Sequence, residues 1–345
     1  MQFEAAPRGT QGFGAPFRFA YAEVGDLGTD RHVVPFRKYC LLQSRLLAEG
    51  IASDDDFVAP DPIPDSDLLL VHCPGYLQRL QLNLLSPTER AVLELPWCPR
   101  LHKAFWLWTG GTLLASQLAL RDGIGFHIGG GFHHAFPDHG EGFCALHDVG
   151  VAIRVLQREG AIRRAMVVDL DAHQGNGTAT IFQGDPTVFT FSMHGAGIYP
   201  DAKPDSDLDI ALDDDVGDEE YLARLEQAYV PLLSNFQPEL IIYAAGADPY
   251  WEDPLGGCLG LSEFGLYRRD LLVIGSARQQ HIPIAVTLGG GYTTPVRKTV
   301  TLHANTVRSA LECWAQVDRA DVPVKINGRR FPVTARVRPV PGHGF

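Results

Sequence analysis

The feature that most constrains this chain is one pattern that occurs four times: a short apolar run, then glycine, then a reactive side chain. The four copies span residues 123–134, 165–177, 240–248 and 284–292. Apolar runs of this length are typical of buried strands, and in an open parallel sheet ligands bind just beyond the carboxyl ends of the strands. We therefore expect these segments to bring two carboxylates, three imidazoles and a phenol to one crevice.

The rest of the chain supports this organisation, because strand-like and helix-like periods alternate from about residue 105 onward. Strands separated by helices indicate right-handed crossovers and a mainly parallel sheet. We expect the acidic segment 201–218 to be an exposed loop, and the segment 75–99 to consist of loops around a short helix. Since no internal repeat or low-complexity linker interrupts the sequence, residues 1–345 are predicted to form one α/β domain. Predicted strands include 166–168, 187–191, 240–244 and 282–287.

Composition narrows the classes of partner. The formal net charge is -12, and an acidic protein is poorly suited to phosphate backbones, so we expect no nucleic-acid partner. The charge would suit a cationic ligand such as a lysine-rich peptide, although solubility alone also explains it. No run reaches the roughly 18 apolar residues of a membrane span, and the start lacks a signal-peptide pattern. We therefore expect a cytoplasmic protein with no membrane partner; its oligomeric state is not predicted.

Asp171 and His173 form the first part of a candidate metal site. On an extended backbone, residues i and i+2 face the same side, so both can bind one ion, and Asp248 at a neighbouring strand exit would be the third ligand. Three protein ligands with an open position are typical of catalytic zinc, although this oxygen-rich set would also accept Fe(II) or Mn(II). The alternatives are a helix cap or loop hydrogen bond for the first two residues, and a helix N-cap ahead of Pro249 for Asp248.

Two further groups are suited to acid–base chemistry. His133 and His134 follow three glycines, and adjacent histidines with different partners can divide general-base and general-acid work. Tyr292 also follows three glycines, and a phenol beside a metal can donate a hydrogen bond to a developing oxyanion. The alternatives are a surface histidine pair and a core tyrosine whose hydroxyl reaches water. Together with the candidate metal ligands, these groups indicate a metal-assisted hydrolase.

The motifs resemble those of the histone deacetylase family, which includes the acetoin-utilisation deacetylases. The resemblance is carried, in order, by residues 129–135 with 142–144, then 169–177, 245–248 and 288–292, and weaker matches extend it to roughly residues 17–315. The form Asp-Ala-His-Gln-Gly-Asn-Gly is most similar to class IV and its bacterial relatives. The resemblance implies a three-layer α/β/α fold with a mainly parallel central sheet, the arginase/deacetylase-like fold. It also implies hydrolysis of an acyl-lysine amide or a similar acylamine.

The resemblance assigns expected roles to individual residues. Asp171, His173 and Asp248 would hold zinc. Water on this ion would attack the acyl carbonyl, with His134 as general base and then general acid, and Tyr292 polarising the carbonyl. The resemblance also makes His133, partnered by Asp169, an electrostatic histidine, and it places Asn176 behind the general base.

Two further parts are implied. The walls of a substrate passage would be formed by Phe143, Tyr199, Gly142 and Gly290. A structural potassium (K+) site would use Asp169, Asp171, His173, Ser192 and Met193.

Three other functions stay open at this point. The first is a deacylase of small acylated amines such as acetylpolyamines. The second is a binuclear manganese ureohydrolase, which needs an aspartate two residues after His173, where this chain has Gly175. The third is an acyl-lysine-binding module without activity, against which the complete set of ligands, histidines and tyrosine argues.

Asn176 stands where many members of the family have an aspartate. An amide cannot stabilise an imidazolium as a carboxylate does, so we expect a lower pKa for His134 than an aspartate would give. Asn176→Asp should therefore move the acidic limb of the pH–rate profile upward, measured as kcat/KM against pH with an acyl-lysine substrate. An unchanged profile would contradict this role for Asn176.

Overall fold

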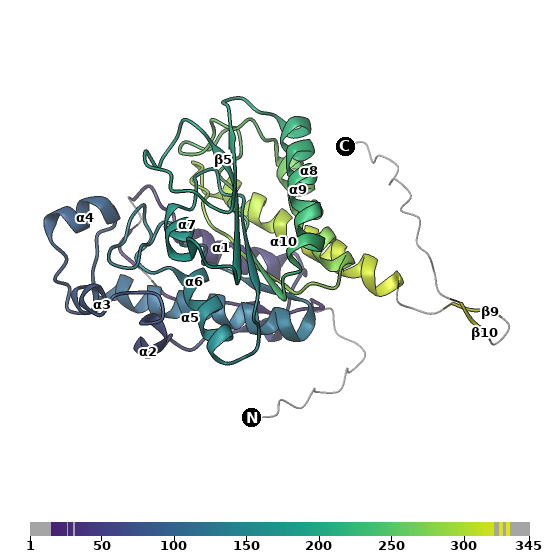
Figure 1. Cartoon of the computed structure of the whole chain (residues 1–345), viewed down its shortest axis with the longest axis horizontal. Coiled ribbons are helices and arrows are strands. Elements are labelled where there is room, and N and C mark those ends of the chain that lie inside the picture. The colour runs from purple at the N-terminus through teal and green to yellow at the C-terminus, as the bar shows by residue number, and fades with distance from the viewer. Residues whose placement is uncertain (1–14, 26, 30–31, 321–323, 327–328, 332–345) are drawn as a thin grey trace.

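A sheet of eight strands organises the structure, a computed structural model that describes residues 15–25, 27–29, 32–320, 324–326 and 329–331 (Figure 1). All neighbouring strands in it are parallel. The four central strands are buried along their whole length, as expected for a parallel sheet covered on both faces. In order across the sheet, the strands are β2 (Phe57–Val58), β1 (Phe19–Ala20), β3 (Ile124–His127), β8 (Ile284–Thr287), β7 (Leu240–Ala244), β4 (Ala165–Asp169), β5 (Val188–Gly195) and β6 (Leu208–Leu212).

Helices cover both faces of this sheet (Figure 1). One group is built on α5, which packs on β3 and β8 and contacts α6; in the second group α1, α10, α9 and α8 pack side by side in that order. The predicted three-layer α/β/α fold is therefore confirmed. The first group comprises α2 (Asp65–Leu68), α3 (Pro74–Gln81), α4 (Pro87–Leu93), α5 (Pro99–Asp122), α6 (Asp148–Arg158) and α7 (Asn176–Phe182). The second comprises α1 (Lys38–Ala48), α8 (Asp218–Phe236), α9 (Glu263–Gln279) and α10 (Arg297–Ala320), after which β9 (Val324–Ile326) and β10 (Arg329–Phe331) form a separate hairpin.

Local sequence accounts for α6 and for the face it buries. The side chain of His147 accepts a hydrogen bond from the N–H of Gly150 and so caps the first turn. An apolar stripe then packs into the core with residues of β4, β5 and β7, and burial of each large aliphatic side chain contributes roughly 1.5–3 kcal/mol. The stripe of α6 consists of Val149, Ala152, Ile153 and Leu156.

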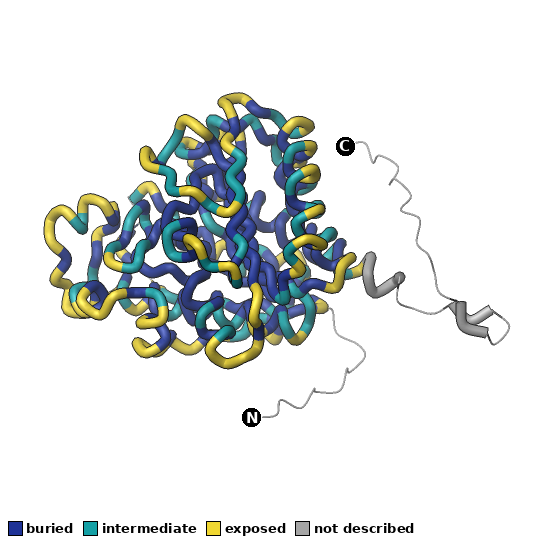
Figure 2. Tube along the Cα trace, viewed as in Figure 1, coloured by how far each residue is buried: buried dark blue, intermediate teal, exposed yellow. Residues whose placement is uncertain are grey.

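Figure 2 shows burial in the whole molecule: the central strands are dark blue, and yellow, which marks exposed residues, is concentrated on outer loops and helix turns.

Two expectations about secondary structure were wrong. The acidic segment 201–218 is not a loop throughout, because it contains β6, which pairs in parallel with β5. This edge strand is only partly buried, and its sequence contains Asp209. It therefore lacks the continuous apolar run by which the central strands are recognised in the sequence. The segment 75–99 contains two helices rather than one, since α3 and α4 begin at Pro74 and Pro87. Proline interrupts helices in their interior but is favoured in the first turn, so Pro74 and Pro87 mark helix starts here and not loops.

Among the described residues, no helix combines the length and apolarity needed to cross a membrane.

A buried arginine ties together the loops that follow β4 and β7. Arg269 of α9 is 1% exposed, and its Nη1 donates to the backbone carbonyls of Leu170 at 3.1 Å and Gly246 at 2.7 Å. Its charge is balanced by Asp270 at 2.8 Å, which also accepts a hydrogen bond from the hydroxyl of Tyr243 at 2.6 Å. The two loops held in this way carry the carboxylates of the predicted metal site.

Arg269→Met should lower the free energy of unfolding by roughly 3–5 kcal/mol, because it leaves a buried carboxylate without its counter-charge. Arg268→Met is the matched control: Arg268 pairs with the exposed Glu219, and such surface pairs contribute about 0–1 kcal/mol. Urea denaturation followed by circular dichroism measures both values. Equal effects of the two substitutions would contradict the anchoring role of Arg269.

Candidate active site

The four sequence motifs meet because the strands that carry them are direct neighbours. β3, β8, β7 and β4 lie side by side in the sheet, although they are far apart in the chain. All four run in the same direction, so their carboxyl ends emerge at one edge, where ligands bind in sheets of this kind. The structure therefore brings the ends of all four motif-bearing strands to one edge of the sheet, as expected from the sequence.

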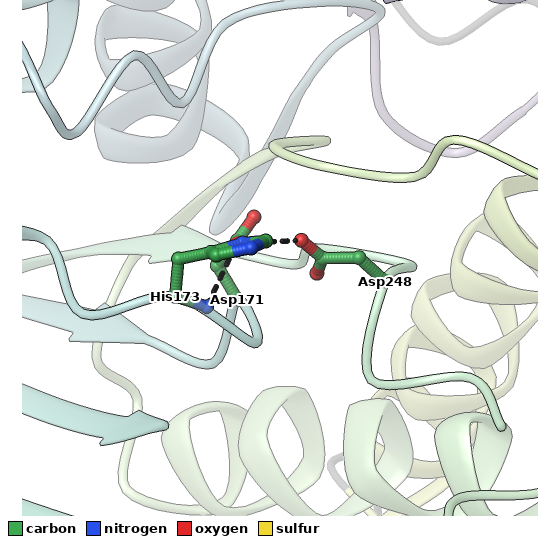
Figure 3. Close-up of side chains that lie close together, drawn as sticks. All are labelled: Asp171, His173 and Asp248. Atoms are coloured by element: carbon green, nitrogen blue, oxygen red, sulfur yellow. Dashed lines mark hydrogen bonds and ion pairs between the residues drawn. The ribbon is translucent and has the colours of Figure 1, made fainter. Parts of the chain in front are cut away.

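Asp171, His173 and Asp248 lie together at this edge and point toward one another (Figure 3). Nδ1 of His173 is 3.0 Å from Oδ1 of Asp171 and 3.0 Å from Oδ2 of Asp248. Backbone groups orient the carboxylates: the N–H of Gly290 donates to Asp171 at 2.7 Å, and the N–H of Ala172 donates to Asp248 at 3.0 Å. In the part of the chain that the structure describes, this is the one group of three or more His, Cys, Asp or Glu residues with ligand atoms within 4.8 Å of one another.

The donor set fits a divalent cation. Two buried carboxylates repel each other and need a positive charge nearby. Burial and the charge of Asp171 raise the pKa of Asp248 to about 7, and although burial opposes it, hydrogen bonding to both carboxylates raises the pKa of His173 to about 10. A divalent cation bound to these three residues would supply the positive charge that the two carboxylates need. Gly290 keeps the space beside the carboxylates open, because a Cβ there would lie 2.3 Å from Oδ2 of Asp248.

His133 and His134 lie beside the cluster and have different partners. Nδ1 of His133 is 2.7 Å from Oδ2 of Asp169, and Nδ1 of His134 is 2.7 Å from Oδ1 of Asn176. Burial would lower the pKa of His133, but the charge of Asp169 outweighs it and raises that pKa to about 9. Burial and the charge of His133 hold the pKa of His134 well below its usual value. The surroundings therefore shift the pKa values of the two adjacent imidazoles in opposite directions.

Tyr292 faces the same point from the loop after β8. Its ring centroid is 6.5 Å from that of His173, and burial raises its pKa well above the usual value, so the phenol remains a donor. Two charged residues hold this loop. Asp253 accepts a hydrogen bond from the N–H of Tyr292 at 2.7 Å, and Lys38 of α1 donates one to the carbonyl of Gly289 at 2.9 Å. Burial lowers the pKa of Lys38 to about 8.

A cavity of about 220 Å³ leads to these groups. Phe143 and Tyr199, the predicted aromatic walls, both line it, and the Tyr199 ring lies edge-on to His134 with centroids 5.0 Å apart. Gly142 must lack a side chain, because a Cβ would lie 2.8 Å from Cδ2 of His134. A second cavity of about 30 Å³ adjoins the first and is lined by Gly290. The larger cavity is lined by Glu94, His134, Gly142, Phe143, His173, Tyr199, Leu255 and Tyr292.

The residues predicted to form a potassium site are also close together. Asp169 at the end of β4 pairs in register with Ser192 of β5, and Met193 is the next residue along that strand. Both of these β5 residues and Asp169 are buried. The hydroxyl of Ser192 is 2.9 Å from Nδ1 of His194. Potassium binding stays a prediction.

Sequence reasoning missed four charged residues that surround the site. Lys38 and Asp253 hold the loop of Tyr292, Glu94 lines the larger cavity, and Glu141 accepts a hydrogen bond from Asn176. Three of them lie outside the motifs and reach the site only through the fold, so no local pattern identifies them. The fourth, Glu141, directly precedes the Gly-Phe-Cys stretch included in the resemblance. This position beside a motif is the sequence signal that could have identified Glu141.

Comparison with known proteins establishes the family. A sequence profile of the histone deacetylase domain matches residues 32–307. This chain belongs to the histone deacetylase family. An uncharacterized protein of Picosynechococcus sp. is 40% identical over 286 residues, which are 83% of this chain and 95% of that protein.

Further relatives and one solved structure agree with this assignment. Histone deacetylase 2 of Arabidopsis thaliana is 36% identical over 256 residues, covering 72% of this chain and 66% of the plant protein. Acetoin utilization protein AcuC of Bacillus subtilis is 31% identical over 246 residues, 64% of this chain and 63% of the relative. The crystal structure of the HDA15 HD domain matches with a TM-score of 0.70 at 21% identity, over 88% of this chain and 92% of that one, and so shows the shared fold. The predicted family and fold are both confirmed.

Cation binding should release protons. Because the pKa of His173 is raised to about 10 in the cation-free cluster, its ring is protonated at neutral pH and must lose that proton to become a ligand. Because the pKa of Asp248 is raised to about 7, this carboxyl is also partly protonated at neutral pH. We expect release of between one and two protons per ion there, and a dissociation constant that rises at least about tenfold for each pH unit lowered. The release should vanish as the pH rises past the pKa of His173. Calorimetry in buffers of different ionisation enthalpy measures it, and binding without proton release at neutral pH would contradict the assignment.

Proposed function

We propose that this member of the histone deacetylase family is a zinc-dependent deacylase of acylated lysine side chains. The observation that supports it most is the cavity of about 220 Å³ with two aromatic walls that ends on His134, His173 and Tyr292. Aromatic faces suit an aliphatic stem such as that of lysine, and a passage of this size suits one side chain. An acyl-lysine in it would have its amide beside the metal ligands, the neutral histidine and the phenol.

A cation held by Asp171, His173 and Asp248 would supply Lewis-acid polarisation of the acyl carbonyl and would acidify a water molecule. Tyr292 donates its hydroxyl proton in a hydrogen bond to the oxygen on which charge develops, and its raised pKa keeps that proton in place. Nζ of Lys38 lies 5.6 Å from the centroid of the Tyr292 ring, on its face, and also holds the loop that bears Tyr292. The phenol is therefore oriented before substrate arrives.

The two histidines divide the remaining work. Neutral His134 has its Nδ1–H directed at Asn176, which leaves Nε2 to take a proton from the attacking water and return it to the leaving amine. His133 keeps its proton because Asp169 raises its pKa to about 9, and its positive charge stabilises the developing oxyanion.

Gly175 supports a site for one catalytic ion rather than two. A Cβ at this position would lie 2.4 Å from Oδ2 of Asp169, so there is no room for the additional aspartate that a binuclear ureohydrolase requires. A small acylated amine is a second candidate substrate. Glu94 lines the same cavity, and its carboxylate would pair with a second ammonium group of an acylated polyamine.

A lysine peptide that carries acyl chains of increasing length tests the proposal. The adjoining cavity of about 30 Å³ has little room beyond a short acyl group, so we expect acetyl-lysine to react fastest. For long fatty acyl chains, kcat/KM should fall by at least about tenfold. Metal analysis should find about one zinc ion per chain, and chelation should abolish turnover.

Acetylated polyamines are the comparison substrates, because faster turnover of these would favour the second candidate. Two manganese ions per chain, or zinc without turnover of any acylated substrate, would contradict the proposed function.

A further inference from the structure

A carboxylate lies one hydrogen bond behind the proposed base. Oε1 of Glu141 accepts a hydrogen bond from Nδ2 of Asn176 at 2.6 Å, and Oδ1 of Asn176 is 2.7 Å from Nδ1 of His134. The side chain of Glu141 is 18% exposed, and the mechanism above does not use it. The three residues form a continuous chain from the cavity to this carboxylate.

We propose that Glu141 is a positioning residue that sets the orientation of the Asn176 amide and, through it, the tautomer of His134. This inference rests on the function proposed above. An asparagine can present either its oxygen or its NH2 group to a neighbour. With the oxygen toward His134, Nδ1 carries the proton and Nε2 is free to act as a base. With the NH2 group toward His134, Nδ1 must accept, and the proton moves to Nε2.

Glu141 selects the first orientation because an ionised carboxylate only accepts hydrogen bonds. Burial would raise its pKa, but hydrogen bonds from its three donors outweigh burial and lower the pKa below the usual value. Facing such an acceptor, Asn176 must present its NH2 group to Glu141 and its oxygen to His134. The backbone N–H of Gly177 donates to the same oxygen at 3.0 Å and adds to this preference.

Glu141 is itself held in place from several directions. The hydroxyl of Tyr199 donates to Oε1, and Nε2 of His139 is 3.5 Å from Oε2. Its backbone N–H donates to the carbonyl of Cys144 at 3.1 Å, and its carbonyl accepts from the N–H of Cys144 at 2.8 Å. These bonds close a tight turn that also carries Phe143. The support of the base and one wall of the cavity therefore belong to the same turn.

The need for Glu141 follows from the residue at 176. Both oxygens of an aspartate accept, so an aspartate behind His134 has no wrong orientation. An asparagine does have a wrong orientation, and a fixed acceptor on the side away from His134 excludes that orientation. The carboxylate that is missing from position 176 is thus present one hydrogen bond further from the base.

Glu141→Ala removes the acceptor and should lower kcat by roughly 10-fold or more, as loss of an orienting partner in the outer shell of a site commonly does. KM should change less than kcat, because the backbone bonds of the turn that carries the wall residue Phe143 remain. Glu141→Gln is the matched control. It keeps an oxygen that can accept from Asn176, so it should retain most of the kcat that the alanine variant loses.

The double variant Glu141→Ala/Asn176→Asp separates positioning from a general role in stability. An aspartate at 176 needs no orienting partner, so the double variant should recover most of the lost kcat when kcat is compared at pH values above the acidic limb, which Asn176→Asp moves upward. A loss caused only by damage to the turn would not be rescued in this way. Failure of the rescue overturns the proposal.

The tautomer of His134 can be measured without turnover, by 15N NMR of zinc-loaded protein labelled at histidine. The wild type and the double variant should show His134 protonated at Nδ1, and Glu141→Ala should show a population protonated at Nε2. An unchanged tautomer in Glu141→Ala overturns the proposal. If the wild type hydrolyses no acyl-lysine, the proposed function fails, and the tautomer measurement still decides the role of Glu141.

Discussion

Two carboxylates buried side by side are the constraint on which the rest of the structure depends. Asp171 and Asp248 lie in the loops after two different strands, β4 and β7, and are 2% and 0% exposed. Water therefore cannot stabilise their charges, and the protein must. Backbone N–H groups orient them, and Arg269 holds the carbonyls of the two loops that bear them. Glycine at 290 leaves the adjacent space open. This edge of the sheet is built around a place for positive charge.

The adjacent histidines show how identical side chains acquire different chemistry from their partners. Both rings are buried to the same extent, with 5% of each residue exposed, so desolvation alone does not distinguish them. His133 faces a carboxylate, whose charge raises its pKa, whereas His134 faces an uncharged amide, and burial with the charge of His133 lowers its pKa. A site with both a fixed charge and a proton acceptor results from this difference in partners.

The sequence predicted the parts of the molecule in which local pattern and final environment agree. The predicted strand 240–244 has the same bounds as β7, because a short continuous apolar run indicates a strand buried on both faces of a sheet. The two-residue strand β1 has no pattern of its own and exists through pairing with β2 and β3. The metal-site residues lay in recognisable motifs, whereas Lys38 reaches the site from a helix 251 residues before its partner Gly289. Contacts of that range depend on the whole fold, and no local window contains them.

The position of β8 has a consequence for how the chain reaches its native state. It is the last strand of the sheet to be synthesised, yet it lies between β3 and β7 near the middle. Until the ribosome has made it, these two older strands have unpaired inner edges, which are the kind of surface that templates aggregation. Pairing over such a long stretch of chain is also slow. A nascent chain that stops short of this strand lacks the centre of its sheet and not merely its rim.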